Sequence, residues 1–121
     1  LIVDADPQGT LVTWHAVATE GGLEAPTVMV MNHTLHRPEQ LPMVAKAYDH
    51  VVIDTAPRLG AVQRAAMMVA DLAVLPCGPS GPDAWALAES IDVIREALTV
   101  KPELKAFICI NKKRASTKLS K

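Results

Sequence analysis

Short, largely apolar runs recur along the chain without the polar alternation of a half-exposed strand. They occupy residues 1–3, 27–31, 50–53, 72–75 and 106–110. Runs of this length are typical of strands that are buried on both faces of a parallel sheet. The pattern therefore predicts several parallel strands, each covered on both sides by other parts of the chain.

Helical spacing of apolar residues fills the intervals between these runs. The predicted helices are residues 38–48, 60–70 and 82–98. The third has a start signal, because Ser80 is followed three residues later by Asp83, as in a capping box, and Pro82 suits the first turn. Strands that alternate with helices predict an α/β fold with a doubly wound, mostly parallel sheet. No repeat or linker interrupts the pattern, so we expect residues 1–121 to belong to a single domain.

Charge is unevenly distributed, although the formal net charge is only −1. Seven of the twelve Lys and Arg residues lie in residues 101–121, where Glu103 is the one acidic residue. This basic end fits nucleic-acid binding or, alternatively, a solvated tail. The sequence shows neither a secretion signal nor an apolar run long enough to cross a membrane, which predicts a cytoplasmic location.

Two cysteines and two tryptophans are expected to have structural roles. Cys77 and Cys109 lie in or beside apolar runs and lack the spacing of a metal site, so the default expectation is buried thiols. Trp14 and Trp85 are expected to pack in the core.

Carboxylates follow two of the predicted strands. Ligands of parallel α/β sheets bind beyond the carboxyl ends of the strands, which directs attention to Asp4, Asp6 and Asp54. Asp54 closes the apolar residues 51–53 in the Walker B pattern, where the carboxylate holds Mg²⁺ or a water bound to it. The alternative role for Asp54 is to cap the next helix.

Asp4 and Asp6 are separated by one residue, so in an extended segment their side chains point the same way. Neighbouring carboxylates repel each other unless a cation or a hydrogen-bond donor separates them. Three such groups predict a hard cation, with Mg²⁺ and phosphate as the favoured combination. The alternative for Asp6 is a helix N-cap in front of Pro7.

Three stretches together resemble the ParA/MinD family of deviant Walker ATPases, and most of all its small ParA-type partition ATPases. They are VDADPQGT, followed by a Trp-containing helix, then YDHVVIDTAPRLG, and ADLAVLPCGPSGPDAW. The resemblance extends from residue 1 to about residue 114, and the motifs occur in the family's order.

The resemblance implies a role for each matching residue. Asp6 corresponds to the catalytic aspartate that positions the attacking water, and Asp4 to its partner that contacts Mg²⁺ through the metal's water shell. Asp54 corresponds to the Walker B aspartate. Asn111 corresponds to an asparagine that contacts adenine, and the loop from Pro79 lies beside the nucleotide and near a dimer partner. The implied cofactors are ATP and Mg²⁺.

The implied function is Mg²⁺-dependent ATP hydrolysis in plasmid or chromosome partition. It includes ATP-dependent homodimerisation, non-specific DNA binding, a centromere-binding adaptor protein as partner, and a nucleoid-associated place in a bacterial cytoplasm. One alternative is a MinD-like regulator of division-site placement, which would need a membrane-binding amphipathic helix. Another is a non-catalytic, truncated module that pairs with an intact homologue. The stretch Asp6-Pro7-Gln8-Gly9 favours the ParA side, and with it no membrane partner.

The family's phosphate-binding loop, KGGxGKT, does not occur in these 121 residues. We therefore expect Leu1 to be an internal residue of a longer protein, preceded by a strand, the P-loop and a helix, with further helices after Lys121. Without the P-loop amides and lysines, residues 1–121 alone are expected to bind ATP poorly and to be inactive. The resemblance also predicts unpaired backbone and exposed apolar surface beside the Walker B strand.

Overall fold

The computed structural model describes residues 1–58 and 60–112 of the chain. The chain divides into two units, Leu1–Val69 and Ala70–Lys121, and the described residues of each unit are considered by themselves. The α/β class and the parallel strands predicted from the sequence are confirmed in both. That the two units belong to a single domain stays a prediction.

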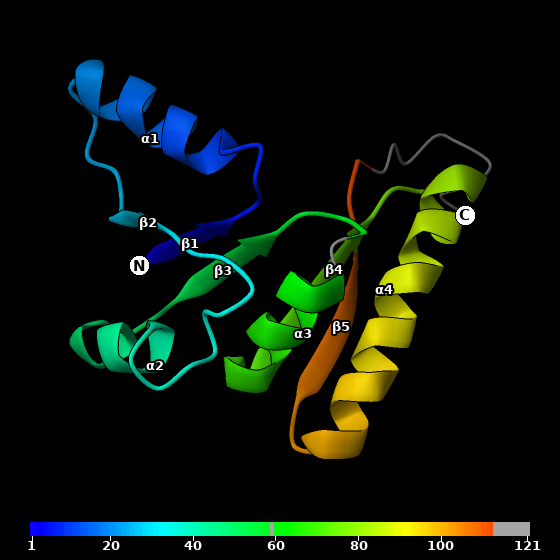
Figure 1. Cartoon of the computed structure of the whole chain (residues 1–121). Coiled ribbons are helices and arrows are strands. Elements are labelled where there is room, and N and C mark those ends of the chain that lie inside the picture. The colour runs from blue at the N-terminus through cyan, green and yellow to red at the C-terminus, as the bar shows by residue number, and fades with distance from the viewer. Residues whose placement is uncertain (59, 113–121) are drawn as a thin grey trace. The chain divides into compact units, whose positions relative to one another are not determined.

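The first unit contains a three-stranded parallel sheet in the order β2-β1-β3 (Figure 1). Its elements are β1 (Ile2–Ala5), α1 (Thr10–Glu20), β2 (Val28–Val30), α2 (Leu41–Val44), the 3₁₀ helix η1 (Ala45–Ala47), β3 (Val52–Thr55) and α3 (Gly60–Val69). Strand β1 is central, with Val3 in register with Met29 on one side and Ile53 on the other. The central position explains why Val3, Asp4 and Ala5 are all buried.

The hydrophobic core of this unit lies on one face of β1. Its buried members are Val3, Ala5, Leu35, Leu41, Val62, Ala65 and Ala66. Side chains alternate along a strand, so Val3 and Ala5 face this core while Asp4 faces the opposite side. Helices α2 and α3 supply the core face, and α1 contacts β1 and β2.

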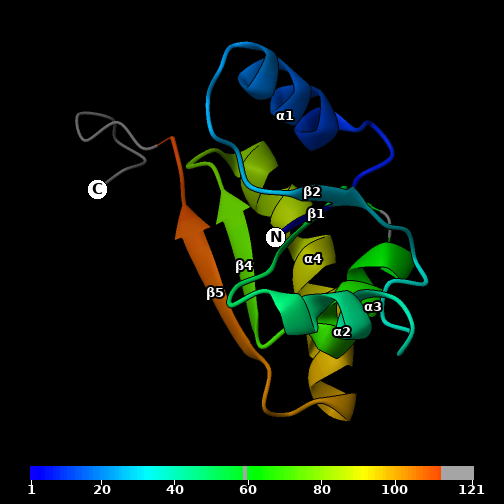
Figure 2. The same cartoon turned by 90° about the vertical axis from the view of Figure 1, so that its left-hand side faces the viewer.

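The second unit consists of two paired parallel strands and one long helix (Figure 2). Strands β4 (Leu72–Cys77) and β5 (Lys105–Ile110) pair over their whole length, and α4 (Gly81–Val100) connects them. The capping box predicted for α4 is confirmed, since the Asp83 amide donates to Ser80 Oγ at 3.2 Å and the Ser80 amide donates to the Asp83 carboxylate at 3.3 Å. Pro82 occupies the first turn, as expected.

Several expectations about burial are wrong. Burial on both faces holds for β1, but β5 is exposed at every position, because α4 packs against β4, where Leu75 and Cys77 are buried, rather than against β5. Cys77 is buried, whereas Cys109 is exposed. Trp14 and Trp85 are 47% and 78% exposed, so neither is a core residue.

The helix expected over residues 38–48 is shorter than predicted. It consists of the four residues of α2 followed by the 3₁₀ turn η1. The other two predicted helices are confirmed, as Gly60–Val69 and Gly81–Val100.

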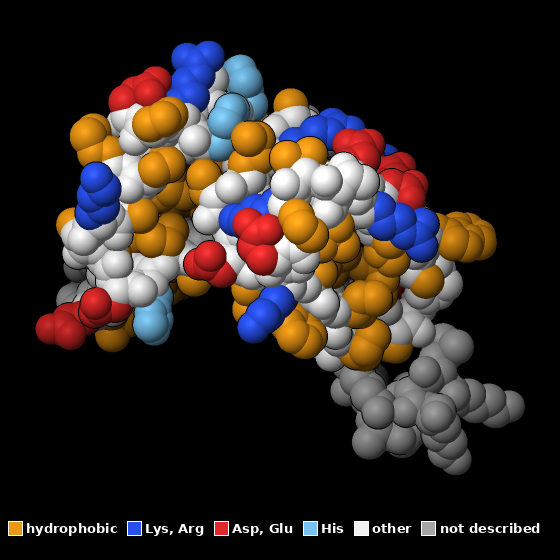
Figure 3. Space-filling model, turned by 90° about the horizontal axis from the view of Figure 1, so that it is seen from below, with side chains coloured by type: hydrophobic (Ala, Val, Ile, Leu, Met, Phe, Trp, Pro, Cys, Tyr) orange, Lys and Arg blue, Asp and Glu red, His pale blue; other side chains and the backbone are white. Residues whose placement is uncertain are grey.

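Apolar side chains are exposed on several strands, as the resemblance predicted near the Walker B strand. Val52 on β3 is 61% exposed, and Leu72 and Val74 on β4 are also exposed. Hydrophobic side chains are likewise visible on the face drawn in Figure 3. Within the described residues, no helix is long and apolar enough to cross a membrane.

Candidate functional site

Two of the predicted aspartates are neighbours at the carboxyl ends of β1 and β3. Asp4 is in register with Asp54 across the parallel pair, and Ala5 is in register with Thr55. Residues in register on parallel strands project from the same face of the sheet. The structure therefore brings Asp4 and Asp54 together as the sequence predicted, with Asp6 just beyond the end of β1.

Asp4 is almost fully buried, with 1% of its surface exposed. Both of its carboxylate oxygens accept backbone hydrogen bonds. The Asp6 amide donates to Oδ1 at 3.2 Å, and the Val12 amide in α1 donates to Oδ2 at 3.1 Å. A buried charge is tolerated when it is hydrogen-bonded in this way.

Asp6 begins the tight turn that leads into α1. The Gly9 amide donates to the Asp6 carbonyl at 3.0 Å, and the Gln8 amide donates to Asp6 Oδ1 at 2.9 Å. Gly9 has a φ of 65°, a left-handed conformation that favours glycine, and it occupies the N-cap position of α1. The alternative interpretation of Asp6 as the N-cap is therefore wrong, and its side chain instead forms an Asx turn.

Asp54 is the exposed member of the three. Partial desolvation, then the charge of Asp4 and then that of Asp6, raise the pKa of Asp54 above its ordinary value of 3.8. Asp54 lies inside β3, six residues before α3 begins, so its alternative role as a helix cap is wrong. Its environment is one in which a bound cation would relieve repulsion.

The donor set suits Mg²⁺, because carboxylate oxygens are hard ligands. Among the described residues, however, no three His, Cys, Asp or Glu side chains form a group that could hold a metal ion. Asp54 offers an exposed carboxylate, while the Asp4 oxygens already accept amide hydrogen bonds. A carboxylate has about four acceptor sites, so Asp4 keeps capacity for a metal-bound water.

The loop after β3 contains a contact that the sequence analysis missed. The buried Gln63 in α3 donates through Nε2 to the Ala56 carbonyl at 3.3 Å. This bond fixes the chain two residues beyond Asp54. The available signal was a polar residue within the apolar face of a predicted helix. Arg58 in the same loop has a φ of 63°, the left-handed region that non-glycine residues rarely adopt.

Pro79 and Asn111 lie together in the second unit. Pro79 follows β4 and Asn111 follows β5, so both are at the carboxyl edge of this parallel pair. The Asn111 amide donates to the Cys77 carbonyl at 2.8 Å, and Asn111 Oδ1 accepts from the Lys112 amide at 2.8 Å. The structure thus places each of these predicted residues at the edge where a ligand of the strands would bind.

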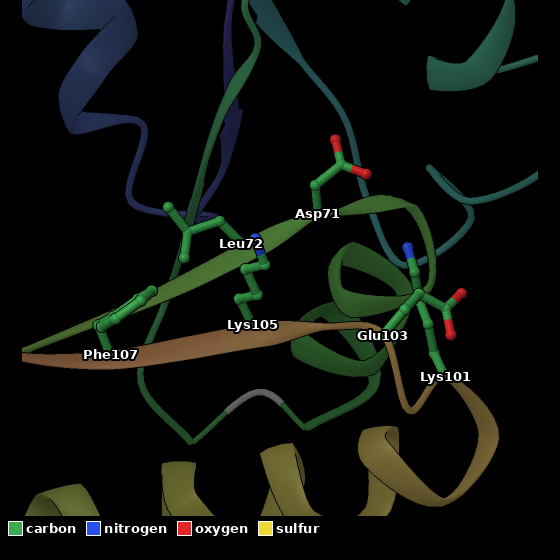
Figure 4. A pocket seen from close by; sticks show the side chains of 6 residues that line it. All are labelled: Asp71, Leu72, Lys101, Glu103, Lys105 and Phe107. Atoms are coloured by element: carbon green, nitrogen blue, oxygen red, sulfur yellow. The ribbon is translucent and has the colours of Figure 1, made fainter.

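A shallow hollow of about 580 Å³ lies at the opposite edge of β4 and β5 (Figure 4). In Figure 4, Leu72, Lys105 and Phe107 project from the same side of the strand pair. Asp71, Lys101 and Glu103 complete its lining. It lies at the amino ends of the strands, so it is separate from the edge that carries Pro79 and Asn111.

Part of the basic end lies within the described residues. Lys101 donates through Nζ to the Ala70 carbonyl at 2.6 Å, and Lys105 and Lys112 are exposed. The remaining basic residues, Lys113 to Lys121, lie outside the described residues.

Comparison with known proteins identifies the family to which the chain belongs. The AAA domain family model matches residues 22–106, a range that includes Asp54 and Pro79. The chain is also 32% identical over 111 residues to the "Maintenance of carboxysome distribution protein A" of Halothiobacillus neapolitanus. The chain belongs to the ParA/MinD family. The match covers 91% of this chain and 51% of that protein, so the chain spans about half the length of the curated relative it matches.

Proposed function

We propose that the protein is a ParA-type ATPase that hydrolyses ATP with Mg²⁺. The observation that carries this proposal is the register of Asp4 with Asp54, with Asp6 held in an Asx turn beside them. ParA/MinD proteins are ATPases, and this arrangement supplies the carboxylates that such chemistry uses. Phosphoryl transfer depends mainly on positioning and charge neutralisation, which fixed carboxylates assist.

The proposed roles follow from how each side chain is held. Asp6 Oδ1 accepts the Gln8 amide, and Asp6 Oδ2 has no hydrogen bond within the described part of the chain, so Oδ2 orients the attacking water. Asp54 and, through water, Asp4 hold Mg²⁺, which when bound neutralises phosphate charge. Asn111 contacts the adenine, and the loop from Pro79 lies beside the nucleotide. The sequence of 121 residues contains no KGGxGKT motif, so phosphate binding is not assigned to any of them.

The test is ATP turnover by protein expressed from its full coding sequence. We expect Mg²⁺-dependent hydrolysis in the wild type and its loss in Asp6→Ala, with nucleotide binding retained. The matched control is Asp49→Asn, because Asp49 is an exposed loop carboxylate outside the site. Turnover that persists in Asp6→Ala would remove Asp6 from the mechanism. A wild type that binds nucleotide without hydrolysing it would favour the non-catalytic module.

We further propose that ATP drives homodimerisation and that the dimer binds DNA without sequence preference in the bacterial cytoplasm, on the nucleoid. Support comes from the family and from the basic end that begins at Lys101. Light scattering with and without ATP tests dimerisation. If basic residues neutralise phosphates, DNA affinity will fall steeply as salt rises, and a flat salt response would contradict this contribution.

The cargo has two candidates. The family resemblance favours DNA partition with a centromere-binding adaptor protein. The 32% identity to a protein named for the maintenance of carboxysome distribution favours carboxysomes as the cargo instead. Deletion of the gene separates the two, since the first predicts loss of a plasmid or chromosome and the second predicts an altered carboxysome distribution with normal DNA inheritance.

A further inference from the structure

Helix α1 begins without a capping side chain of its own. Its N-cap residue is Gly9, which makes no side-chain hydrogen bond, and its first turn contains no acidic residue. The first four amides of a helix lack intrahelical partners, and the positive end of the helix dipole favours a negative charge nearby. A helix that starts in this way needs an acceptor from elsewhere in the chain.

Asp4 supplies that acceptor from the neighbouring strand. Val12 is the third residue of α1, and its amide donates to Asp4 Oδ2 at 3.1 Å. This is the amide that a serine or aspartate at the N-cap would normally satisfy. The other oxygen, Oδ1, accepts the Asp6 amide at 3.2 Å. One buried carboxylate therefore joins Asp6, where the turn begins, to the first turn of α1.

We propose that Asp4 is a positioning residue that sets the location of the Asp6 carboxylate by acting as a remote cap for α1. This inference rests on the proposed ATPase function. Asp4 is 1% exposed and lies on the central strand, so its position is fixed by the sheet. Its two hydrogen bonds hold the Asp6 turn and the first turn of α1 at a fixed distance from the sheet.

The positioning role of Asp4 requires that both of its side-chain oxygens accept hydrogen bonds. Asp4→Asn keeps the shape of the side chain but exchanges one acceptor oxygen for an NH₂ group. An amide NH₂ facing either the Asp6 or the Val12 amide places two donors against each other. We therefore expect the turn to shift, and displacement of a reacting group by about 1 Å lowers a rate about 100-fold.

A reciprocal variant removes the donor and leaves Asp4 unchanged. Val12→Pro deletes the amide that Asp4 Oδ2 accepts, and a proline in the first turn costs no intrahelical hydrogen bond. Leu11→Pro is the matched control, because it also places proline after a helical first-turn residue, and no hydrogen bond among the described residues joins the Leu11 amide to Asp4. Circular dichroism checks that each variant folds.

The experiment measures kcat, the KM for ATP and the Mg²⁺ half-saturation of the protein expressed from its full coding sequence. A positioning role predicts that Val12→Pro lowers kcat about 100-fold without changing the Mg²⁺ half-saturation, because the Asp4 carboxylate is untouched. Asp4→Asn should lower kcat about 100-fold even at saturating Mg²⁺, while Leu11→Pro keeps the wild-type kcat. If Val12→Pro keeps the wild-type kcat and Asp4→Asn recovers the wild-type kcat at high Mg²⁺, Asp4 acts through the metal alone and the inference is overturned.

Amide hydrogen exchange separates this inference from the proposed function. In Asp4→Asn we expect exchange of the Asp6 and Val12 amides to accelerate about tenfold relative to Asp49→Asn, in line with the loss of a helix cap. Unchanged exchange at both amides overturns the inference even if the enzyme is active. A wild type without ATP turnover would refute the proposed function, and faster exchange in the same protein would still support the link that Asp4 makes between turn and helix.

Discussion

The two units of the chain hold their candidate site residues in different ways. In Leu1–Val69, the carboxylates lie on or beside β1 and β3, and the central strand β1 is buried against a cluster that includes Leu35 and Leu41. In Ala70–Lys121, Pro79 and Asn111 follow β4 and β5, and β5 is exposed at every position. The first unit thus positions its site through a packed core, and the second through local hydrogen bonds.

This difference determines which substitutions will lower the stability of each unit. A two-stranded sheet is only marginally stable by itself, whereas a third strand and a packed face add substantial stability. The second unit compensates near its candidate residues with the Ser80–Asp83 capping box and the bond from the Asn111 amide to Cys77. We therefore expect core truncations to matter most in the first unit and loop substitutions to matter most in the second.

The largest expected effect comes from a matched pair of leucines. Leu35 is fully buried in the first unit, and Leu72 is 48% exposed on β4. Leu35→Ala is expected to lower the free energy of unfolding by about 2–5 kcal/mol, because it removes packing and leaves a cavity. Leu72→Ala should cost about 1 kcal/mol or less, since its side chain is already partly hydrated.

Denaturant titration measures the two free energies, and peptide-resolved hydrogen exchange assigns each loss to one unit. Leu35→Ala should accelerate exchange across β1 and β3. Equal losses for the two variants would mean that β4 is packed as tightly as the core of the first unit, and the comparison between units would then fail.

A second matched pair tests the loop that leads into α4. A Cβ added at Gly78 would collide with the Asp83 carboxylate of the capping box, whereas a Cβ at Gly81 meets nothing within 4 Å. Gly78→Ala is expected to destabilise the protein by about 0.5–2 kcal/mol, because the Asp83 side chain must leave the capping box. Gly81→Ala should be neutral or stabilising by up to about 1 kcal/mol, because it restricts the unfolded chain.

Thermal unfolding compares these two alanine variants, and exchange of the Asp83 and Ala84 amides reports on the cap itself. Loss of protection at these amides in Gly78→Ala alone is the expected result. If both variants behave alike, the capping box does not govern the start of α4.

Much of this fold could be predicted because its signals are local. The strand-length apolar runs predicted the position of each described strand to within a few residues. The spacing of Ser80 and Asp83 predicted where α4 begins. Burial was less predictable, because it depends on which helices and loops cover each strand in the folded protein. The sequence runs of β1 and β5 look alike, yet β1 is covered by a core cluster that includes Leu35 and Leu41, whereas α4 packs against β4 and leaves β5 exposed.

The candidate site divides in the same way. The register of Asp4 with Asp54 follows from two apolar runs that are each followed by an aspartate, so the sequence pattern could indicate it. The bond from the Val12 amide to Asp4 could not be read from spacing, because it joins a strand to a helix across a glycine turn. The Gln63 contact with Ala56 is another tertiary hydrogen bond of this kind.

The smallest expected effect is a gain in stability on removing a site carboxylate. The pKa of Asp54 is raised above 3.8 by partial desolvation and by the charges of Asp4 and Asp6, so the folded state holds this proton more tightly than the unfolded state does. Stability is therefore present at low pH and falls as pH rises from about 3.8 through the raised pKa of the folded state. Asp54→Asn removes this pH-dependent loss of stability, because asparagine does not ionise.

We accordingly expect Asp54→Asn to be slightly more stable than the wild type at neutral pH and equally stable below about pH 3.8, where Asp54 is protonated in both states. Because Asp54 is exposed, water screens the repulsion and keeps the gain small. Unfolding curves measured against pH, with Asp49→Asn as control, give the difference. Mg²⁺ should reduce this difference in stability, because it stabilises the wild type alone. Only the wild type has the exposed Asp54 carboxylate to which the cation can bind. A variant that is less stable than the wild type at neutral pH without Mg²⁺ would show that Asp54 makes favourable contacts in the folded protein, and the first unit would then contain no repulsion for a cation to relieve.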